Sequence, residues 1–174
     1  MKLSQAIELI KDPDIPTAGK TCWTDLGCGS GLFTNALSFL LEPESTIYAV
    51  DKNIHALSKL EPMNNIAIEK LQSDFINDEL NFNDLDGILM ANSLHFVRDK
   101  ATVINKMIKL LKENGCFLIV EYDTDSPNPW VTYPVSYRSL TLLFEKHRYG
   151  FIKKINQMPS KYNRSAIYSA LIRR

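Results

Sequence analysis

Three glycines at alternate positions, Gly27, Gly29 and Gly31, form a short segment near the start of the chain. Glycine adopts positive φ angles without strain and lets a ligand approach the backbone closely, so this spacing is typical of a ligand-binding turn. A dinucleotide-binding turn would have its third glycine at position 32, where the chain has Leu32. An acid, Asp25, comes shortly before the first glycine. The pattern predicts a cofactor-binding turn and argues against a nicotinamide dinucleotide.

Two further acids follow later apolar runs. Asp51 comes directly after residues 46–50, and Asp74 follows residues 66–71. A carboxylate can accept hydrogen bonds from both hydroxyls of a vicinal diol, and open α/β sheets bind ligands at the carboxyl ends of their strands. We therefore expect both acids near the glycine turn. The alternatives are a surface turn residue for Asp51, a loop cap for Asp74, and a supporting role beneath the turn for Asp25.

The glycines and acids are positioned by strands and helices that alternate along the chain. We expect strands at residues 21–26, 46–50, 66–71, 87–91 and 116–121. We expect helices at residues 3–10, 32–41, 54–60, 99–112 and 135–148. Such alternation indicates a parallel sheet with helices on both faces. The last two runs, 151–158 and 166–172, are joined by a short turn at 159–164 and should pair antiparallel.

Composition restricts the class of protein. The chain has 174 residues, of which 45% are hydrophobic and 23% charged, and this fits one globular domain. No apolar run approaches the roughly 18–20 residues of a membrane-spanning helix, and Glu8 and Lys11 interrupt the apolar stretch that a signal peptide needs. Cys22, Cys28 and Cys116 form no CxxC motif, so we expect neither a metal site nor a redox pair. These features indicate a cytoplasmic protein with reduced thiols.

The segment from Asp25 to Gly31 resembles motif I of the Rossmann-like S-adenosylmethionine-dependent methyltransferases, in which an acid and three alternate glycines open the fold. Asp51, followed by Lys52, occupies the family's position for the acid that binds both ribose hydroxyls. Asp74 matches the acid that accepts a hydrogen bond from the adenine amino group, and Phe75 is placed to flank the ring. The resemblance implies S-adenosylmethionine as the cofactor, with these residues around it.

The resemblance continues after the expected fourth strand. Asn92 begins the sequence Asn-Ser-Leu-His-Phe, which matches the family's loop facing the sulfonium, and residues 111–118 resemble the lead-in to strand five. Amino methyltransferases of the family carry Asp/Asn-Pro-Pro-Tyr/Phe at this position, and the chain departs from them. Its Asn-x-Leu-His is closer to the small-molecule methyltransferases of the ubiquinone-biosynthesis type. Asn128-Pro129-Trp130 lies after strand five and is not given that role.

The resemblance implies a doubly wound, Rossmann-like α/β fold with a mostly parallel sheet and an antiparallel C-terminal strand. It covers roughly residues 20–122. We expect a single methyltransferase domain over residues 1–174, made of an N-terminal helix and linker at 1–19, a cofactor-binding core at 20–122, and an acceptor-side loop, helix and C-terminal strands at 123–174.

Methyl transfer from a sulfonium is an in-line displacement that requires positioning and a water-poor pocket more than covalent work by the protein. Where the nucleophile carries a proton, His95 is the first candidate for the base. Trp130, Tyr133 and Tyr137, in the loop after strand five, are candidates for the acceptor pocket, and the two tyrosines and Asp123 are weaker candidates for the base. The alternatives are a histidine satisfied within the core or a loop, and aromatic side chains that pack on the core.

Charge is unevenly distributed, although the chain as a whole is neutral. Residues 138–174 carry nine basic residues and one acid, a net charge of +8, and the remainder carries −8. A basic segment is one feature of nucleic-acid-binding proteins, so an RNA methyltransferase is one alternative. A second alternative, independent of this charge, is a nucleotide-binding module without catalytic activity. Lys153 and Lys154 should point to opposite faces of a strand, which scatters the charge. We therefore expect a small-molecule acceptor, no tight nucleic-acid binding and no membrane partner.

Overall fold

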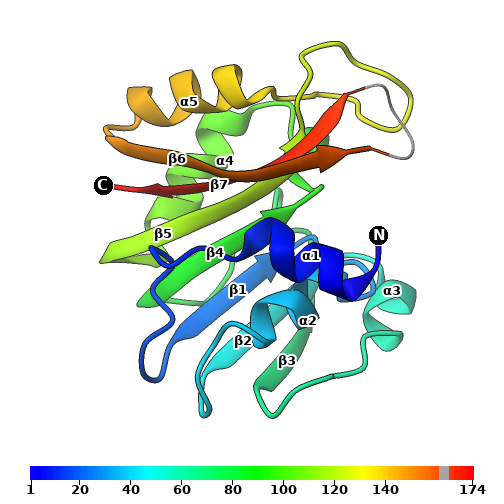
Figure 1. Cartoon of the computed structure of the whole chain (residues 1–174), viewed down its shortest axis with the longest axis vertical. Coiled ribbons are helices and arrows are strands. Elements are labelled where there is room, and N and C mark those ends of the chain that lie inside the picture. The colour runs from blue at the N-terminus through cyan, green and yellow to red at the C-terminus, as the bar shows by residue number, and fades with distance from the viewer. Residues whose placement is uncertain (161–164) are drawn as a thin grey trace.

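The computed structural model describes residues 1–160 and 165–174. Its strands are β1 (Cys22–Leu26), β2 (Thr46–Asp51), β3 (Ala67–Gln72), β4 (Leu85–Ala91), β5 (Leu111–Tyr122), β6 (Phe151–Pro159) and β7 (Ala166–Arg173). They form one sheet in the order β3-β2-β1-β4-β5-β7-β6 (Figure 1). β1 to β5 pair in parallel, and β7 is antiparallel to both β5 and β6. The expected α/β fold, with a mostly parallel sheet and an antiparallel C-terminal strand, is confirmed.

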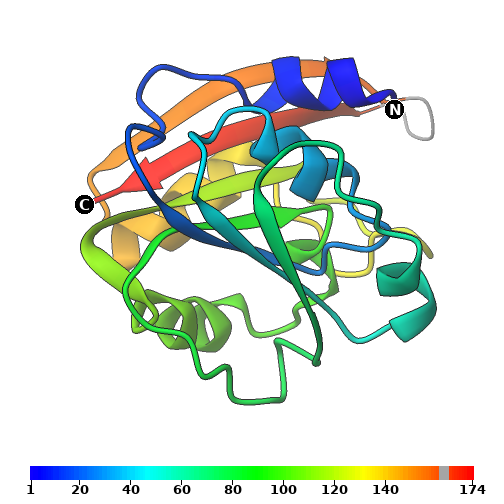
Figure 2. The same cartoon turned by 90° about the horizontal axis from the view of Figure 1, so that it is seen from below.

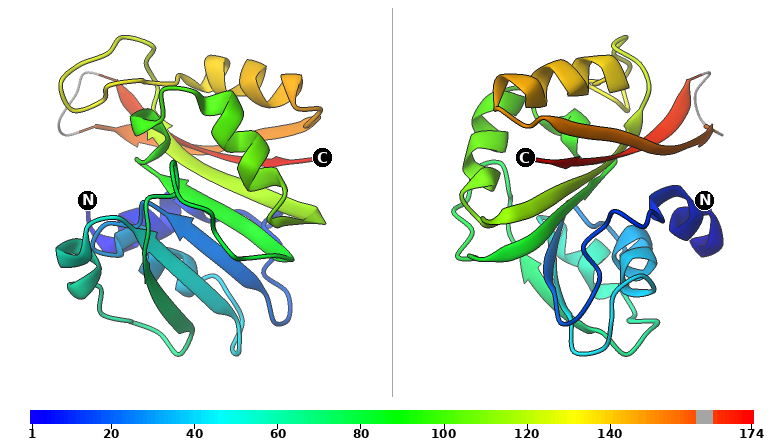
Figure 3. Two further views of the ribbon diagram at one scale, coloured as in Figure 1. Left: turned by 180° about the vertical axis from the view of Figure 1, so that it is seen from behind. Right: turned by 60° about the vertical axis from the view of Figure 1, so that its left-hand side comes forward.

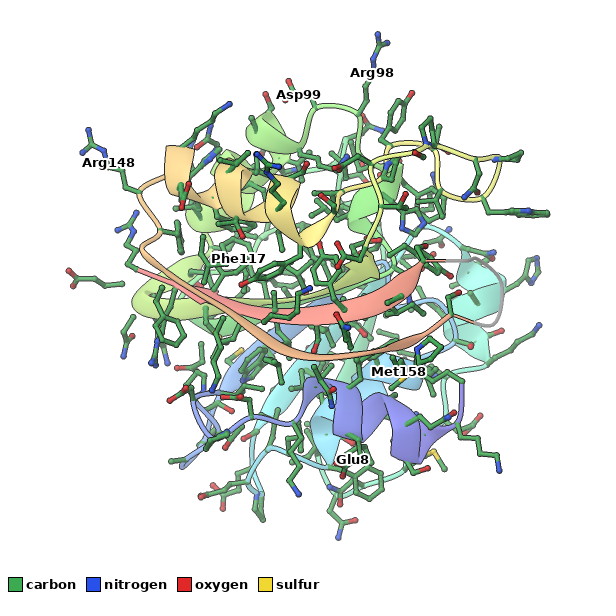
Figure 4. All side chains as sticks on the ribbon, turned by 45° about the horizontal axis from the view of Figure 1, so that its top comes forward. Glu8, Arg98, Asp99, Phe117, Arg148 and Met158 are labelled. Atoms are coloured by element: carbon green, nitrogen blue, oxygen red, sulfur yellow. The ribbon has the colours of Figure 1, made fainter. Side chains whose placement is uncertain are left out.

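Helices cover both faces of this sheet, as expected. They are α1 (Leu3–Ile10), α2 (Leu32–Ser38), α3 (Ile54–Ser58), α4 (Lys100–Ile108), α5 (Tyr137–Lys146) and a short 3-10 helix, η1 (Leu94–Phe96). α1 and α2 lie on one face and α4 and α5 on the other (Figure 3). Each face has its own core: Trp23 and Leu37 are buried on the first, and Phe117 (Figure 4) and Phe144 on the second. None of the helices in the described residues is long and apolar enough to cross a membrane.

The N-terminal helix packs beside the C-terminal strands, and Figure 2 shows α1 next to β6. Two side chains of these strands bind the main chain of α1. The Asn156 amide donates to the carbonyl oxygen of Glu8 at 3.1 Å, and the Ser169 hydroxyl donates to that of Leu9. The apolar side of α1 is buried, because Ala6, Leu9 and Ile10 are fully inaccessible. The first helix of the chain is therefore fixed to its last two strands.

The boundary between α4 and β5 differs from the expectation of a helix over residues 99–112 that stops before Gly115. α4 ends at Ile108 and β5 begins at Leu111, because Leu111 pairs with Leu85 before the register of the two strands shifts. Gly115 lies in this irregular part of β5, where a Cβ would stand 2.9 Å from the carbonyl oxygen of Leu85. Glycine is therefore needed here for close contact between two strands, not for ending a helix.

Other helices are shorter than expected. α2 ends at Ser38 and not at residue 41, and α3 ends at Ser58 and not at residue 60. α5 begins at Tyr137 because the hydroxyl of Ser136 caps its first turn by accepting a main-chain N–H. The expected turn at 159–164 lies partly outside the described residues, and the antiparallel pairing of β6 with β7 that it predicted is confirmed.

Candidate functional site

The glycine turn joins β1 to α2 with three left-handed residues. Gly27, Gly29 and Gly31 have φ angles of +77°, +56° and +85°. A Cβ on Gly27 would lie 2.6 Å from the Cβ of Ser93, and one on Gly31 would lie 2.3 Å from the Cγ of Leu60. A Cβ on Gly29 would meet nothing within 4 Å. The outer two glycines are therefore required by packing, and the middle one faces open space.

The carboxylate of Asp51 holds this turn against the end of β2. Its Oδ2 accepts the main-chain N–H of Gly29 and its Oδ1 that of Asn53, both at 2.8 Å. The N–H of Gly27 donates to the carbonyl oxygen of Val50, also at 2.8 Å, and completes the connection. A carboxylate has about four acceptor positions, so Asp51 retains positions for the hydroxyl groups of a ligand.

Asp25 lies beneath the turn, fully buried in β1. The hydroxyl of Thr34 donates to its Oδ2 at 2.6 Å, and its buried Oδ1 has no partner. Burial raises the pKa of this carboxyl to about 7; the Thr34 hydrogen bond opposes the rise and the charge of Asp51 adds to it. This position fits the supporting role that the sequence left open for Asp25.

Asp25→Asn should change how the stability of the protein depends on pH. In the fold Asp25 keeps its proton up to about pH 7, whereas in the unfolded chain it loses the proton near its ordinary pKa of 3.8. Between these values the native state binds more protons, so the free energy of unfolding falls as the pH rises. Asparagine still accepts from Thr34 but does not titrate. As the pH rises from 5 to 7, the free energy of unfolding of the variant should increase by about 2–3 kcal/mol relative to that of the wild type. Urea unfolding measures this difference, and a difference that does not change with pH would contradict the raised pKa.

A cavity of about 310 Å³ lies at the carboxyl ends of β1 to β4, on the side of the molecule where Figure 1 shows α3. This is the edge at which open α/β sheets bind ligands. Six of the residues predicted to bind the cofactor line this first cavity: Gly27, Asp51, Lys52, Asp74, Phe75 and Asn92. The other predicted residues, Asp25, Gly29 and Gly31, lie in or beneath the turn that borders it.

Five further residues on the wall of the first cavity were not predicted. They are Asn53 after β2, Ser73 and Ile76 after β3, and Ser93 and Phe96 after β4. Each one follows the carboxyl end of a strand. Applying the strand-end rule to every polar or aromatic residue in these loops, and not only to the acids, would have found most of them.

The carboxylate of Asp74 caps the turn after β3 as well as lining the first cavity. It accepts the N–H of Ile76 at 3.1 Å and the side-chain amide of Asn77 at 3.0 Å. Phe75, next in the chain, is only 7% exposed and is held in the core beneath the cavity. Because a carboxylate has further acceptor positions, the cap and the predicted contact with the cofactor are compatible for this one side chain.

Unpaired polar atoms gather around this site. Among the described residues, five buried side-chain polar atoms have no hydrogen-bond partner, and three of them belong to Asp25, Asn92 and Ser93. Buried polar groups in folded proteins are nearly always paired. Asp25 is in β1, and Asn92 and Ser93 directly follow β4, the neighbouring strand. The site therefore fits a ligand that carries its own hydrogen-bonding groups.

His95 is buried and pairs with another buried residue, Glu121 of β5. Its Nδ1 lies 2.7 Å from Glu121 Oε2, and its main-chain N–H donates to Oε1 at 3.1 Å. An ionised Glu121 can only accept, so Nδ1 donates to it, and in the neutral imidazole Nε2 then has the lone pair that a base uses. The centre of the imidazole is 4.3 Å from that of the Phe96 ring and 6.0 Å from that of the Tyr122 ring. Glu121 was not predicted as a site residue. The feature of the sequence that could have identified it is the presence of an acid near the end of an otherwise apolar strand.

The three aromatic residues predicted for the acceptor pocket do not line the first cavity. Trp130 is 82% exposed on its loop. Tyr133 lies beside the base candidate, because its N–H donates to the carbonyl oxygen of His95 at 2.9 Å. The ring of Tyr137 packs against that of Tyr168, with 5.6 Å between their centres, under α5. The structure therefore brings only Tyr133 close to His95.

Comparisons with known proteins agree with this fold. A family model described as a methyltransferase domain matches residues 20–167. A methyltransferase from Methanosarcina mazei is 15% identical, with a TM-score of 0.68 over 89% of this chain and 92% of the other. One from Aquifex aeolicus is 17% identical, with a TM-score of 0.66 over 100% of both chains. Magnesium protoporphyrin IX methyltransferase from Synechocystis is 12% identical, with a TM-score of 0.67 over 97% and 76%. The comparison with curated proteins found no match.

The sheet order, the glycine turn and the cavity beside it define the class of Rossmann-like methyltransferases. The chain belongs to the methyltransferase domain family, whose model covers most of its length. It is an S-adenosylmethionine-dependent methyltransferase, so the enzyme class and the cofactor that the sequence implied are confirmed. The ubiquinone-biosynthesis-like subtype stays a prediction.

Proposed function

We propose that the enzyme methylates a small-molecule acceptor in the cytoplasm and that the first cavity holds the cofactor. Asp51 would accept from the ribose hydroxyls, and Asp74 and Phe75 would contact the adenine. When bound, S-adenosylmethionine supplies an electrophilic methyl group on a positively charged sulfur. The support for this placement is the wall of the cavity, where the predicted acids meet the glycine turn, and the unpaired polar atoms of Asn92 and Ser93.

The observation that carries a small-molecule acceptor is that three of the seven described basic residues of the C-terminal segment, Lys153, Lys154 and Arg173, form ion pairs with acids of the fold. Lys153 lies 2.8 Å from the carboxylates of Asp12 and Asp14, on the α1 side of β6. Lys154 lies 3.1 Å from Asp123, one of the weaker candidates for the base, on the α5 side. The two lysines thus point to opposite faces, as predicted, and offset acids elsewhere in the chain. This distribution of charge favours a small acceptor over RNA, whose binding requires many unpaired basic groups on one surface.

His95 is the proposed base. An acceptor that carries a proton on its nucleophilic atom would have to lose it as that atom bonds to the methyl group and the sulfur leaves with the electrons of the broken carbon–sulfur bond. The proton that the acceptor loses would pass to Nε2 of His95, because Nδ1 is held by Glu121. Because His95 and Glu121 are both buried, water would be excluded from this proton transfer.

S-adenosylhomocysteine, the demethylated product, should bind the protein with micromolar affinity. At 100 times its Kd it should stabilise the fold by about 2.7 kcal/mol. For a chain of this size that corresponds to a rise in Tm of about 5–10 °C, measured by thermal shift with NAD as the control. A clear shift with NAD and none with either adenosyl ligand would overturn the proposed cofactor site.

Asp51→Ala should weaken S-adenosylhomocysteine by about 10- to 150-fold, because charge-assisted hydrogen bonds contribute about 1.5–3 kcal/mol. Asp86→Ala is a matched control, since Asp86 also accepts two bonds, from the Cys22 N–H at 2.8 Å and the Lys112 ammonium at 2.7 Å, but near the amino end of β4. Both variants should lose stability, and only Asp51→Ala should lose affinity. A loss below about threefold by calorimetry, less than one such bond contributes, would make Asp51 a structural acid only.

A further inference from the structure

A second cavity, of about 210 Å³, lies on the α1/α2 side of the sheet. Segments far apart in the chain form its walls: the starts of α1, α2 and β7, and the ends of β5 and β6. Figure 4 shows Met158, on this wall, near the end of β6 and beside α1. The hydrogen bonds from Asn156 and Ser169 to α1 hold these elements together.

The two cavities meet at Asn92, which lines both. Its main chain takes a φ of +54° after β4, and its N–H donates to the carbonyl oxygen of Val120 at 2.8 Å. Its side-chain Oδ1 is buried and has no partner. Leaving a buried acceptor unpaired is unfavourable, and an O–H or N–H group of a ligand would remove that cost. Molecules bound in the two cavities would therefore be neighbours at this residue.

The wall of the second cavity is mainly apolar. Its apolar residues include Leu32, Phe33, Tyr122, Met158, Pro159 and Ile167. None of the described side chains on this wall is an acid, a lysine or an arginine, and Met1, which carries the positively charged amino terminus, also lies on it. A cationic ligand would therefore lose its hydration without meeting a counter-charge. Pockets for drug-sized molecules span about 300–1,000 Å³, and this volume is smaller. The cavity is suited to a compact molecule that carries no positive charge.

We propose that the second cavity binds the methyl acceptor, a compact and mainly apolar small molecule that carries no positive charge and whose hydroxyl or amine group donates to Asn92 Oδ1. The inference rests on the proposed function, because it takes the first cavity as the cofactor site. The base candidate lies at the same junction: the ring of His95 is next to Phe96 of the first cavity and Tyr122 of the second. The acceptor site is thus assigned to the start of α1 and the ends of β5 and β6, and not to the loop that carries Trp130.

The test uses the full chain, labelled with ¹³C at its methionine methyl groups and saturated with S-adenosylhomocysteine. Phenol and indole are neutral probes with one donor each. Both are expected to shift the methyl signal of Met158 and to leave that of Met63, which is 59% exposed elsewhere, unchanged. Anisole, which lacks the O–H of phenol, and protonated benzylamine, which is a cation, should bind about tenfold more weakly.

Met158→Trp should fill the cavity and remove probe binding, whereas the matched Met63→Trp should not. Both variants should retain S-adenosylhomocysteine, which shows that they fold. Probes that leave Met158 unaffected, or that bind the Met158→Trp protein equally well, would overturn the second cavity as the acceptor site. Probe binding that is lost in Trp130→Ala and kept in Met158→Trp would also overturn it. Wild-type protein that binds no S-adenosylhomocysteine would instead contradict the proposed function.

Discussion

His95→Ala is expected to lower turnover by about 10²–10⁴-fold, the usual contribution of general acid–base catalysis, with little change in affinity for S-adenosylhomocysteine. Nδ1 lies 2.7 Å from the carboxylate of Glu121, and in the neutral tautomer that donates to this carboxylate Nε2 is available to take a proton. The imidazole is buried and is not on the wall of the first cavity, so its removal should spare the cofactor. Turnover is measured as release of S-adenosylhomocysteine in the presence of an acceptor.

The matched control is His55→Ala, which removes an exposed imidazole in α3 and should leave turnover unchanged. Glu121→Gln tests the pair from its other side. The amide keeps an oxygen for the His95 N–H but places a donor opposite Nδ1, which moves the ring hydrogen to Nε2. We expect kcat to fall with an unchanged KM for the acceptor and the ¹⁵N spectrum of the ring to report the other tautomer. Unchanged turnover of His95→Ala at neutral pH would remove the imidazole from the mechanism.

The sequence predicts well those features that depend on neighbours along the chain. The glycine turn and the acids that end strands are local patterns, and the fold places Gly27, Asp51 and Asp74 around one cavity. The parallel sheet follows from the alternation of strands and helices, because parallel neighbours need a crossover. The sequence could therefore indicate the cofactor side of the site before the structure was known.

Features that depend on contacts between distant segments were not predicted. Glu121 acquires its importance only when β5 lies beside the loop after β4 and presents the carboxylate to His95. Gly115 reads as a helix stop along the chain, and only its close contact with Leu85 shows that it belongs to a strand. Trp130 lies in a loop whose apolar residues follow no helical or strand period. The local sequence therefore does not distinguish an exposed aromatic side chain from one that lines a pocket.

Gly29→Val is expected to abolish or strongly weaken cofactor binding while the protein still folds. A Cβ on Gly29 would meet nothing within 4 Å, so the side chain would project from the turn into open space. In the proposed placement, the cofactor would approach the turn through this space. Overpacking of a close contact costs about 1–3 kcal/mol, which is about 5- to 150-fold in affinity. The positive φ of +56° adds strain of about 1–2 kcal/mol to the fold itself, so the effects on affinity and stability have to be separated.

Gly19→Val separates them, because Gly19 has a φ of +72° and a Cβ there would also meet nothing within 4 Å. Its N–H donates to the carboxylate of Glu42 at 2.9 Å, much as the N–H of Gly29 donates to that of Asp51 at 2.8 Å. Both variants should lose similar stability in urea unfolding, since the backbone strain is the same. Only Gly29→Val should lose S-adenosylhomocysteine in calorimetry. Equal affinities in the two variants would mean that the ligand does not approach the turn at Gly29, and the cofactor would then have to be placed elsewhere in the first cavity.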